Sequence, residues 1–157
     1  MARRSLKVSL ALTVIALLAF SGACRTSPPP PTLRTTRMTL GGKQLTLEVA
    51  DNDDTREYGL MKRDSMPADH GMIFVFPDER SRSFWMKNTR FPLDIIYISA
   101  AGKVVSVHSM RAYDLTPISS AAPAKYDIEL NEGNATTLGV HAGDQLSIPN
   151  DARDPAR

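Results

Sequence analysis

A polar segment that begins at the only tryptophan is the part of the chain best suited to chemistry. Trp85 is followed by Asn88 and Thr89 and then, past Pro92, by Asp94. An aromatic ring beside amide, hydroxyl and carboxylate groups is typical of sites for small polar molecules. These residues predict a binding site for a small polar or glycan ligand. A polar turn whose Asn88 and Thr89 side chains bond only the local backbone remains the alternative.

Two carboxylates on expected strands, Asp94 and Glu129, offer a catalytic alternative. Carboxyl groups that share a cleft can act as general acid and general base, and an envelope glycan hydrolase or lyase could use them in this way. The simpler hypothesis is structural, with each carboxylate in an ion pair with Arg56 or Arg63. We therefore assign no catalytic residue and include Arg56, Arg63 and Glu129 in the candidate ligand-binding surface.

Methionines near a histidine raise a third hypothesis, copper handling. Thioether and imidazole groups suit Cu(I), and the chain has Met61, Met66, Met72 and Met86 with His70. Their spacing matches no compact metal motif, and methionines more often fill hydrophobic cores. The sequence also lacks a Gly-x-Ser-x-Gly motif, a Cys–His pair, a phosphate-binding loop and a zinc motif. We expect no metal and no other cofactor.

The N-terminal segment predicts export and a lipid anchor. Three basic residues precede an apolar run over residues 8–20, and small residues then lead to Cys24, the only cysteine. This order is typical of a secretory signal, and the apolar run is short for a bilayer span. We assign residues 1–23 to a signal peptide and residues 24–34 to a lipidated Cys24 and a proline-rich tether.

Two other arrangements of this segment stay open: an uncleaved anchor helix, and simple cleavage that leaves a free thiol on Cys24. Ser21 stands where lipoprotein signals usually carry an aliphatic residue. Acylation, however, would protect a lone thiol in an oxidising compartment. We expect an extracytoplasmic, membrane-anchored protein on the periplasmic side of the cell envelope. Its expected partners are the membrane surface and a glycan or an envelope protein.

The charge of the expected mature chain argues against a nucleic-acid partner. The full sequence has a formal net charge of +2, and removal of residues 1–23 takes away three basic groups and leaves −1. Nucleic-acid binding requires a concentrated basic surface. The apparent basicity belongs mostly to the signal peptide.

An all-β domain must position the candidate residues. The chain of 157 residues is of ordinary size for one domain. Apolar segments separated by turn residues recur along it, with one clear helix, which predicts a β-sandwich or small barrel over residues 35–149. Residues 150–157 are polar, and we expect a disordered tail there.

The pattern also predicts individual elements. In residues 125–130, Tyr126, Ile128 and Leu130 alternate with Asp127 and Glu129, so we expect the apolar residues on one face and the two carboxylates on the other. The expected elements are a hairpin of 37–40 with 43–50, a helix from 52 or 53 to 63, a hairpin of 72–76 with 84–86, a hairpin of 93–99 with 103–110, a strand at 125–130, a helical turn after 133, and a last strand at 145–148.

Several motifs, in order along the chain, resemble those of the domain of unknown function 192 (DUF192) family. They are Arg-Glu-Tyr-Gly-Leu-Met-Lys-Arg at 56–63, Gly-Met-Ile-Phe-Val-Phe-Pro at 71–77, Phe-Trp-Met-Lys-Asn-Thr at 84–89 with Pro-Leu-Asp at 92–94, and Tyr-Asp-Ile-Glu-Leu at 126–130, with Gly139 and Gly143-Asp144. The resemblance covers about residues 37–148. It implies a compact, mainly antiparallel and jelly-roll-like β-sandwich with one or two short helices, and no established activity.

The resemblance also implies where this chain differs. Family members, which are small exported bacterial and archaeal domains, often carry a cysteine in the loop before the strand that holds Tyr126. This chain has Ile118, Ser119 and Ser120 there. Thiol chemistry at that loop is therefore not expected.

Overall fold

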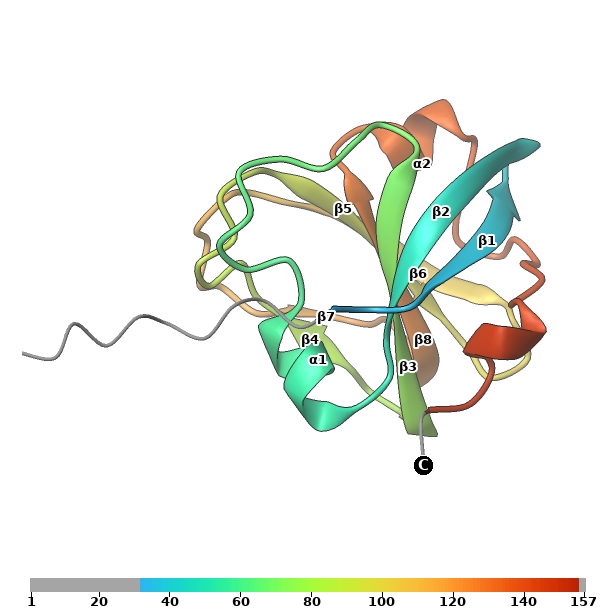
Figure 1. Ribbon diagram of the computed structural model, residues 1–157. Coiled ribbons are helices and arrows are strands. Elements are labelled where there is room, and N and C mark those ends of the chain that lie inside the picture. Colours follow the sequence, from blue (N-terminus) through green and yellow to red (C-terminus); the bar gives the residue numbers. More distant parts are fainter. Residues whose placement is uncertain (1–31, 156–157) are drawn as a thin grey trace, which may run out of the picture.

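The computed structural model describes residues 32–155. The predicted signal peptide, Cys24 and the tether up to residue 31 lie outside the described residues. Strands dominate the described chain, with short helices between them (Figure 1). The elements are β1 (Thr35–Leu40), β2 (Lys43–Ala50), α1 (Asp53–Tyr58), β3 (His70–Arg80), β4 (Ser83–Phe84), β5 (Leu93–Ile98), β6 (Val104–Met110), β7 (Ile118–Ser119), β8 (Ala124–Asn131), α2 (Asn134–Thr137) and the 3-10 helix η1 (Asn150–Ala152).

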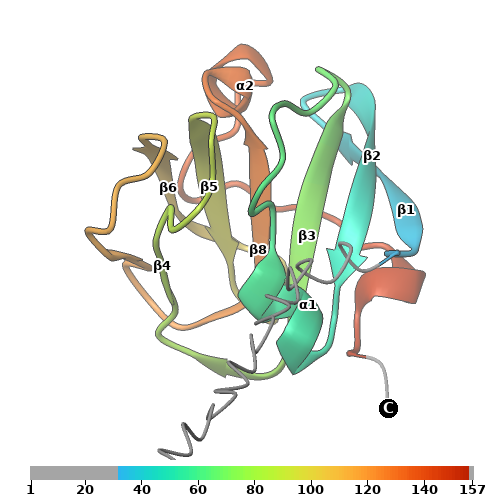
Figure 2. The ribbon, with the colours of Figure 1, turned by 60° about the vertical axis from the view of Figure 1, so that its left-hand side comes forward.

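Six strands form one sheet in the order β1-β2-β3-β8-β5-β6, and β4 pairs with β7 in a second, two-stranded sheet. Figure 2 shows β3, β2 and β1 on one side of β8, with β5 and β6 on the other. All neighbours in the large sheet are antiparallel except β2 and β3, which α1 connects as a parallel crossover. The predicted all-β, mainly antiparallel fold with few short helices is confirmed.

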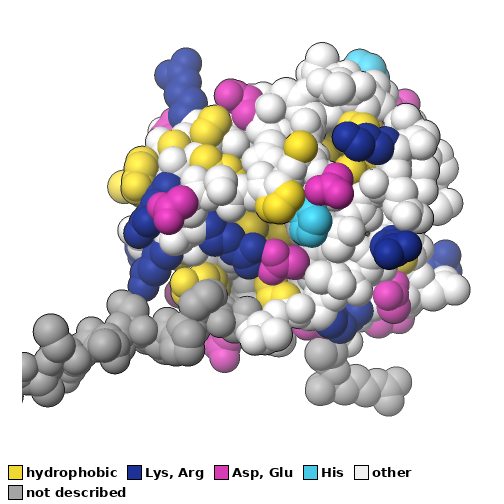
Figure 3. All heavy atoms as spheres, turned by 45° about the horizontal axis from the view of Figure 1, so that its top comes forward, with side chains coloured by type: hydrophobic (Ala, Val, Ile, Leu, Met, Phe, Trp, Pro, Cys, Tyr) yellow, Lys and Arg dark blue, Asp and Glu magenta, His cyan; other side chains and the backbone are white. Residues whose placement is uncertain are grey.

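The surface of the domain carries both signs of charge. On the face shown in Figure 3, basic, acidic and hydrophobic side chains are interspersed. Several basic side chains form ion pairs, including Arg34 with Asp51 at 2.8 Å and Lys125 with Asp154 at 3.1 Å. Within residues 32–155, no helix has the length and apolar character needed to cross a membrane.

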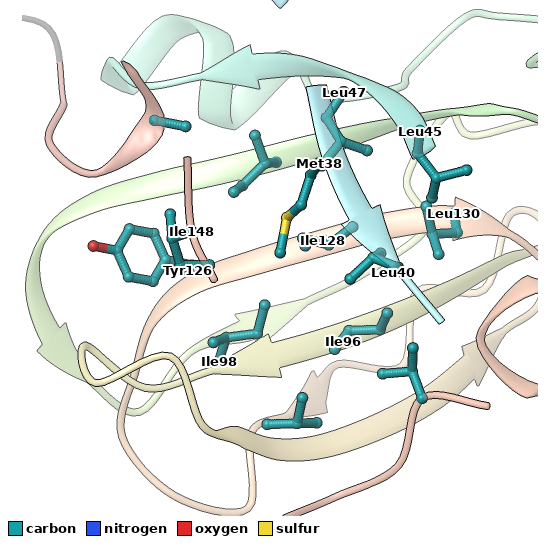
Figure 4. Packing of buried hydrophobic residues seen from close by; sticks show 14 of the residues in the cluster. Met38, Leu40, Leu45, Leu47, Ile96, Ile98, Tyr126, Ile128, Leu130 and Ile148 are labelled. Atoms are coloured by element: carbon teal, nitrogen blue, oxygen red, sulfur yellow. The ribbon is translucent and has the colours of Figure 1, made fainter. Parts of the chain in front are cut away.

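Alternate residues of the central strands pack into two hydrophobic cores. On β3, Ile73 and Val75 belong to one core, whereas Met72 and Phe74 belong to the other. Figure 4 shows the first core, with side chains from β1, β2, β5 and β8. Because successive side chains of a strand point to opposite faces, the large sheet is covered on both faces. This burial explains why Met72 to Phe76 is an unbroken apolar run.

Helix α1 begins with a capping box and ends at a glycine. The Asn52 side chain accepts a hydrogen bond from the Thr55 backbone N–H at 3.0 Å, and the Thr55 hydroxyl accepts one from the Asn52 backbone N–H at 3.2 Å. Gly59 then has φ of +48°, which few other residues adopt. The helix therefore stops at Tyr58, before the predicted end at residue 63. A Cβ at Gly59 would lie 3.4 Å from the Phe74 ring.

The hairpin predicted from residues 72–76 and 84–86 is wrong. Strand β3 runs on to Arg80 and is flanked by β2 and β8, so neither of its edges is free for residues 84–86. Short β4 pairs with β7 instead, where Phe84 lies opposite Ile118. The register between β3 and β8 shifts after Val75, close to Pro77, whose missing N–H cannot contribute to a ladder.

The C-terminal part of the described chain packs against the start of the sheet. Residues 145–148 form no strand, and only an isolated bridge joins Lys103 to Gln145. Ala152 is buried in the first core, and the Thr36 hydroxyl donates to the Asp151 carboxylate at 2.7 Å. The stretch up to residue 155 is thus held to the domain, whereas we expected a loose tail.

Candidate ligand-binding site

A cavity of about 590 Å³ opens where α1 and the segment from β3 to β4 face the second core. Its lining combines aromatic rings, arginines and one buried carboxyl group. Residues from five parts of the chain meet there: α1 and the turn after it, strand β3, the segment 80–85, Thr89, and Glu129 on β8. Such a mixture of apolar walls and a few polar groups is typical of a small-molecule site.

Phenylalanine rings form the aromatic wall of the cavity, and Tyr97 packs against one of them. The Phe84 ring meets Phe74 edge-to-face at 4.9 Å between centroids, and it lies 6.5 Å from Phe76 and 6.1 Å from Tyr97. The Tyr97 hydroxyl donates to the Ile118 carbonyl at 2.6 Å and so ties β5 to β7. Burial raises the pKa of Tyr97, which stays neutral.

Two arginines line the cavity with their guanidinium groups already engaged. Arg56 donates to the Val75 carbonyl at 2.7 Å and to Asp53 at 2.6 Å. Arg82, only 5% exposed, donates to the Asp78 carboxylate at 2.7 Å and stacks 3.8 Å from the centre of the Phe76 ring. Both positive charges therefore have a carboxylate partner.

Glu129 is the polar group at the inner wall of the cavity. On β8 it lies between Met72 of β3 and Ile95 of β5, in the centre of the sheet, and its residue is 5% exposed. No other residue within 32–155 forms a hydrogen bond or ion pair with its side chain. Burial raises the pKa of Glu129 to about 8, because a charged carboxylate loses its hydration there.

Asp127 lies two residues earlier on β8 and points to the same face. It is fully buried between Phe74 and Tyr97 of the neighbouring strands. Neither of its carboxylate oxygens has a hydrogen-bond partner in the part of the chain that the structure describes. Burial raises the pKa of Asp127 well above its usual value, partly offset by the positive charge of Arg82.

Trp85 and Thr89 complete the predicted set of residues that reach the cavity. Trp85 lines its mouth and is 48% exposed, with the Lys87 ammonium group 5.2 Å from the ring. Thr89 is buried and also lines the cavity. Of the residues predicted from the sequence, the structure therefore brings together Arg56, Trp85, Thr89 and Glu129.

Three predicted residues lie elsewhere. Arg63 forms a two-pronged ion pair with Glu48 at 2.5 and 2.7 Å, which ties the segment after α1 to β2. Asn88 is exposed with φ of +57°, and its carbonyl accepts from the Lys62 N–H at 2.8 Å. Asp94 is buried away from the cavity.

The proposed pairing of Asp94 with Glu129 fails on the register of the sheet. Asp94 lies opposite Leu130, so its side chain points to the other face from Glu129. There it accepts hydrogen bonds from the Ser109 hydroxyl at 2.7 Å and from the Ala135 N–H at 2.9 Å. The two carboxylates cannot share a cleft, which removes the acid–base pair.

The structural alternative for these carboxylates is wrong in its details as well. Asp94 pairs with a serine and a backbone N–H rather than with an arginine, and Glu129 has no basic partner among the described residues. Arg56 and Arg63 instead pair with Asp53 and Glu48. Asp53 and Glu48 lie close to these arginines in the fold, but no pattern in the sequence marked them as the partners.

Sequence reasoning missed Arg82 and Asp127. We expected Asp127 only to lie on the face opposite Tyr126 and Ile128 and assigned it no role. The alternation is correct, but β8 is a central strand, and the second face is covered as well. The pair Asp127 and Glu129 at an interval of two was the signal that could have indicated a shared site. Arg82 carried no such signal.

The methionines of the copper hypothesis occupy different environments. Met66, Met72 and Met86 are buried in the second core, whereas Met61 lines the cavity. The His70 ring lies 2.8 Å from the Asp69 carboxylate. Among residues 32–155 there is also no group of three or more His, Cys, Asp or Glu side chains arranged to hold a metal ion.

Two solved structures resemble this chain closely in fold. A crystal structure from Sinorhizobium meliloti 1021, named a "putative transcription regulator", has 37% sequence identity and a TM-score of 0.66, and the match covers 78% of this chain and 97% of that one. A protein of unknown function from Novosphingobium aromaticivorans DSM 12444 has 32% identity and a TM-score of 0.68, with 78% and 91% covered. No curated protein matches the chain.

The family model gives the assignment over the whole β domain. The model of DUF192, described as "Uncharacterized ACR", matches residues 36–148. This range includes every strand from β2 to β8 and all residues that line the cavity. The chain belongs to the DUF192 family.

Proposed function

We propose that this protein is an exported, lipid-anchored domain that binds a small polar ligand, such as a sugar, in the cavity beside Glu129. The observation that carries the proposal is the Glu129 carboxyl group, which faces a cavity of about 590 Å³ without a hydrogen-bond partner among the described residues. A buried polar group of this kind normally has a partner, so a bound molecule would satisfy it.

The walls of the cavity suit a compact ligand with one apolar face. Its volume falls within the usual range for small-molecule sites. Phe84 and Trp85 offer ring surfaces on which a sugar or another flat molecule could stack, and Thr89 adds a buried hydroxyl-bearing side chain. Polar groups of the ligand would thus meet Glu129 at the inner wall, and its apolar surface would meet the aromatic rings at the sides.

Support for export and the anchor comes from the sequence. Basic residues, an apolar run and small residues precede Cys24 in the order of a lipoprotein signal. A lipid on Cys24 would place the domain within about ten residues of a membrane surface, since β1 begins at Thr35. The ligand would then be a molecule of the cell envelope.

The Sinorhizobium relative is named a "putative transcription regulator", but the charges of this chain do not favour a nucleic-acid partner. The proposed mature chain has a formal net charge of −1, and basic side chains are interspersed with acidic ones on the face shown in Figure 3. Sequence-independent binding to nucleic acid depends on many basic side chains that are free to contact phosphates, and this charge distribution does not favour it.

A ligand screen with matched variants tests the proposal. The full chain in mild detergent would be screened by thermal shift against sugars, peptidoglycan fragments, nucleotides and small amines. A ligand at a hundred times its dissociation constant stabilises the folded state by about 2.7 kcal/mol, which shifts Tm by several degrees. We expect a hit whose shift falls at least by half in Glu129→Gln and is unchanged in Glu132→Gln.

Glu132 is a suitable control because it follows β8 closely but is exposed. Hits that stabilise Glu129→Gln as much as the wild type would place the ligand elsewhere and contradict the proposal. A screen without any hit would contradict small-molecule binding. Capture of an envelope protein by the wild type, lost on substitution of the exposed Trp85, would then favour a protein partner.

A further inference from the structure

We propose that the cavity selects a small organic ammonium ion, a primary amine or an amino sugar, whose N–H groups donate to Glu129. The proposal rests on the proposed function and narrows its ligand class. It follows from which polar groups of the cavity already have partners and which do not.

Two carboxyl groups on this face of β8 are acceptors without a donor, and Nε2 of His108 on β6 is also buried without a partner among residues 32–155. The Glu129 side chain, which lines the cavity, forms no hydrogen bond or ion pair with another described residue, and both carboxylate oxygens of Asp127, which lies beside the lining, are buried without a partner. The two side chains leave β8 on the same face, with their Cα atoms roughly 7 Å apart. A ligand that brings N–H donors and a positive charge would satisfy Glu129 and lower the free energy of both buried carboxyl groups in their charged forms.

The positive groups of the cavity already have carboxylate partners. Arg56 is paired with Asp53, and Arg82 and Arg80 both lie beside Asp78, at 2.7 and 3.5 Å. Their hydrogen-bonding groups point to carbonyl oxygens and carboxylates of the protein itself. An anionic ligand would therefore have to compete with existing ion pairs, whereas an ammonium ion would not.

The aromatic walls provide a second, independent reason. The Phe76 ring already has the Arg82 guanidinium 3.8 Å and the Arg56 guanidinium 5.2 Å from its centroid, and Lys87 lies over Trp85. Ring faces attract cations through their quadrupoles. Within residues 32–155 no such cation lies over Phe84, which lines the cavity 4.9 Å from Phe74 and 6.1 Å from Tyr97 between centroids, so this ring remains available to a cation of the ligand.

Binding of an ammonium ion should be coupled to loss of a proton from Glu129. A buried Glu129 without a counter-ion retains its proton, and a bound ammonium ion would displace that proton. The ionisable groups around Glu129 come from every neighbouring element. They are Asp53, Arg56, Glu57 and Tyr58 of α1, Arg80 and Arg82 at the end of β3, Tyr97 of β5, His108 of β6 and Asp127 of β8. Comparison of the wild type with Glu129→Gln separates the proton released by Glu129 from protons released by these other groups.

Paired probes of nearly equal shape give the test. Benzylamine would be compared with benzyl alcohol, and glucosamine with glucose, by isothermal titration of the full chain in detergent. We expect each amine to bind at least ten times more tightly than its neutral counterpart. Glu129→Gln should abolish this preference, and Glu132→Gln should keep it.

The number of protons released on binding gives a further test, because a purely structural role of Glu129 would not change it. At pH 7, benzylammonium binding should release close to one proton from Glu129. The binding heat would then depend on the ionisation enthalpy of the buffer. The affinity for benzylammonium should also rise about tenfold from pH 6 to pH 7. Glu129→Gln should release none.

The outcomes separate this inference from the proposed function. Equal binding of amine and alcohol, or tight binding of neutral sugars alone, would overturn the ammonium inference and leave the proposed function standing. If no small molecule of either kind binds the folded protein, both are overturned.

Discussion

At the scale of single residues, Glu129 shows how strand register sets chemistry. The same residue type at the solvated Glu132 has no comparable role, although it is only three positions away. Glu129 is placed by the pairing of β8 with β3 and β5, which surrounds it with Met72 and Ile95. Desolvation, rather than a neighbouring charge, then raises the pKa of Glu129 to about 8.

This shift predicts the pH dependence of stability. Between its ordinary pKa of 4.5 and about 8, the folded protein holds a proton on Glu129 that the unfolded chain releases. Stability therefore falls as pH rises through this window. Glu129→Gln removes the effect, and we expect it to gain about 2–5 kcal/mol relative to wild type between pH 4.5 and pH 9.

Urea denaturation of both proteins at several pH values measures this gain. The difference between wild type and Glu129→Gln isolates Glu129 from the other carboxyl groups, which titrate in both. Glu132→Gln serves as the exposed control and should track the wild type. A difference in unfolding free energy that stays constant from pH 4.5 to pH 9 would contradict the buried, unpaired state of Glu129.

Asp94 is predicted to act in folding alone. Its carboxylate joins β6 and α2 by accepting from the Ser109 hydroxyl and the Ala135 N–H. Asp94→Ala leaves both donors without this partner, one of them buried, and should lower the unfolding free energy by about 2–3 kcal/mol. Ligand affinity of the folded variant should be unchanged. An Asp94→Ala protein of normal stability but impaired binding would restore Asp94 to the site.

At the scale of elements, local patterns predicted local structure well. The hairpin of β1 and β2 turns at Gly41 and Gly42, which both have positive φ, and that of β5 and β6 turns beside Gly102. The apolar alternation of β1 and β2 appears as burial in the first core, whereas β5 is buried on both faces. Pairings between distant segments, such as β4 with β7 or β2 with β3, depend on which edges remain free. No short window of sequence contains that information.

Gly71 tests the close approach of three strands. A Cβ at this position would lie 2.7 Å from the Glu129 carbonyl oxygen and 2.8 Å from a Leu47 methyl group. Gly71→Ala should therefore force β2, β3 and β8 apart and lower the unfolding free energy by about 1–3 kcal/mol. Thermal denaturation would show the loss. A variant as stable as the wild type would mean that the strands are less closely packed than described.

At the scale of the whole molecule, the site lies where the second core meets solvent. The sequence predicted the all-β class and four of the cavity residues, because composition and alternation reflect burial. It gave Asp127 no role, since alternation indicates two faces but not what covers each. The second face is covered by Leu60 from the turn after α1, Phe84 of β4 and Ile118 of β7, and the first two are far from β8 along the chain.

Membrane attachment is a prediction for the full chain in its host. Cys24→Ser removes the proposed lipid attachment site, and we expect the protein to move from the membrane fraction to the soluble fraction or to remain as unprocessed precursor. Fractionation and metabolic labelling with a fatty acid would show this. Membrane association that persists in Cys24→Ser without precursor accumulation would contradict the lipid anchor.

Trp85 offers the most direct test that the cavity is the binding site, because the only tryptophan of the chain lines its mouth. A hit from the ligand screen would be titrated while Trp85 fluorescence is recorded for the wild type, Glu129→Gln and Glu132→Gln. We predict a saturable change in emission for the wild type and Glu132→Gln that is weakened at least tenfold in Glu129→Gln. A ligand that stabilises the protein but leaves Trp85 emission unchanged, or binds Glu129→Gln equally well, would contradict the account.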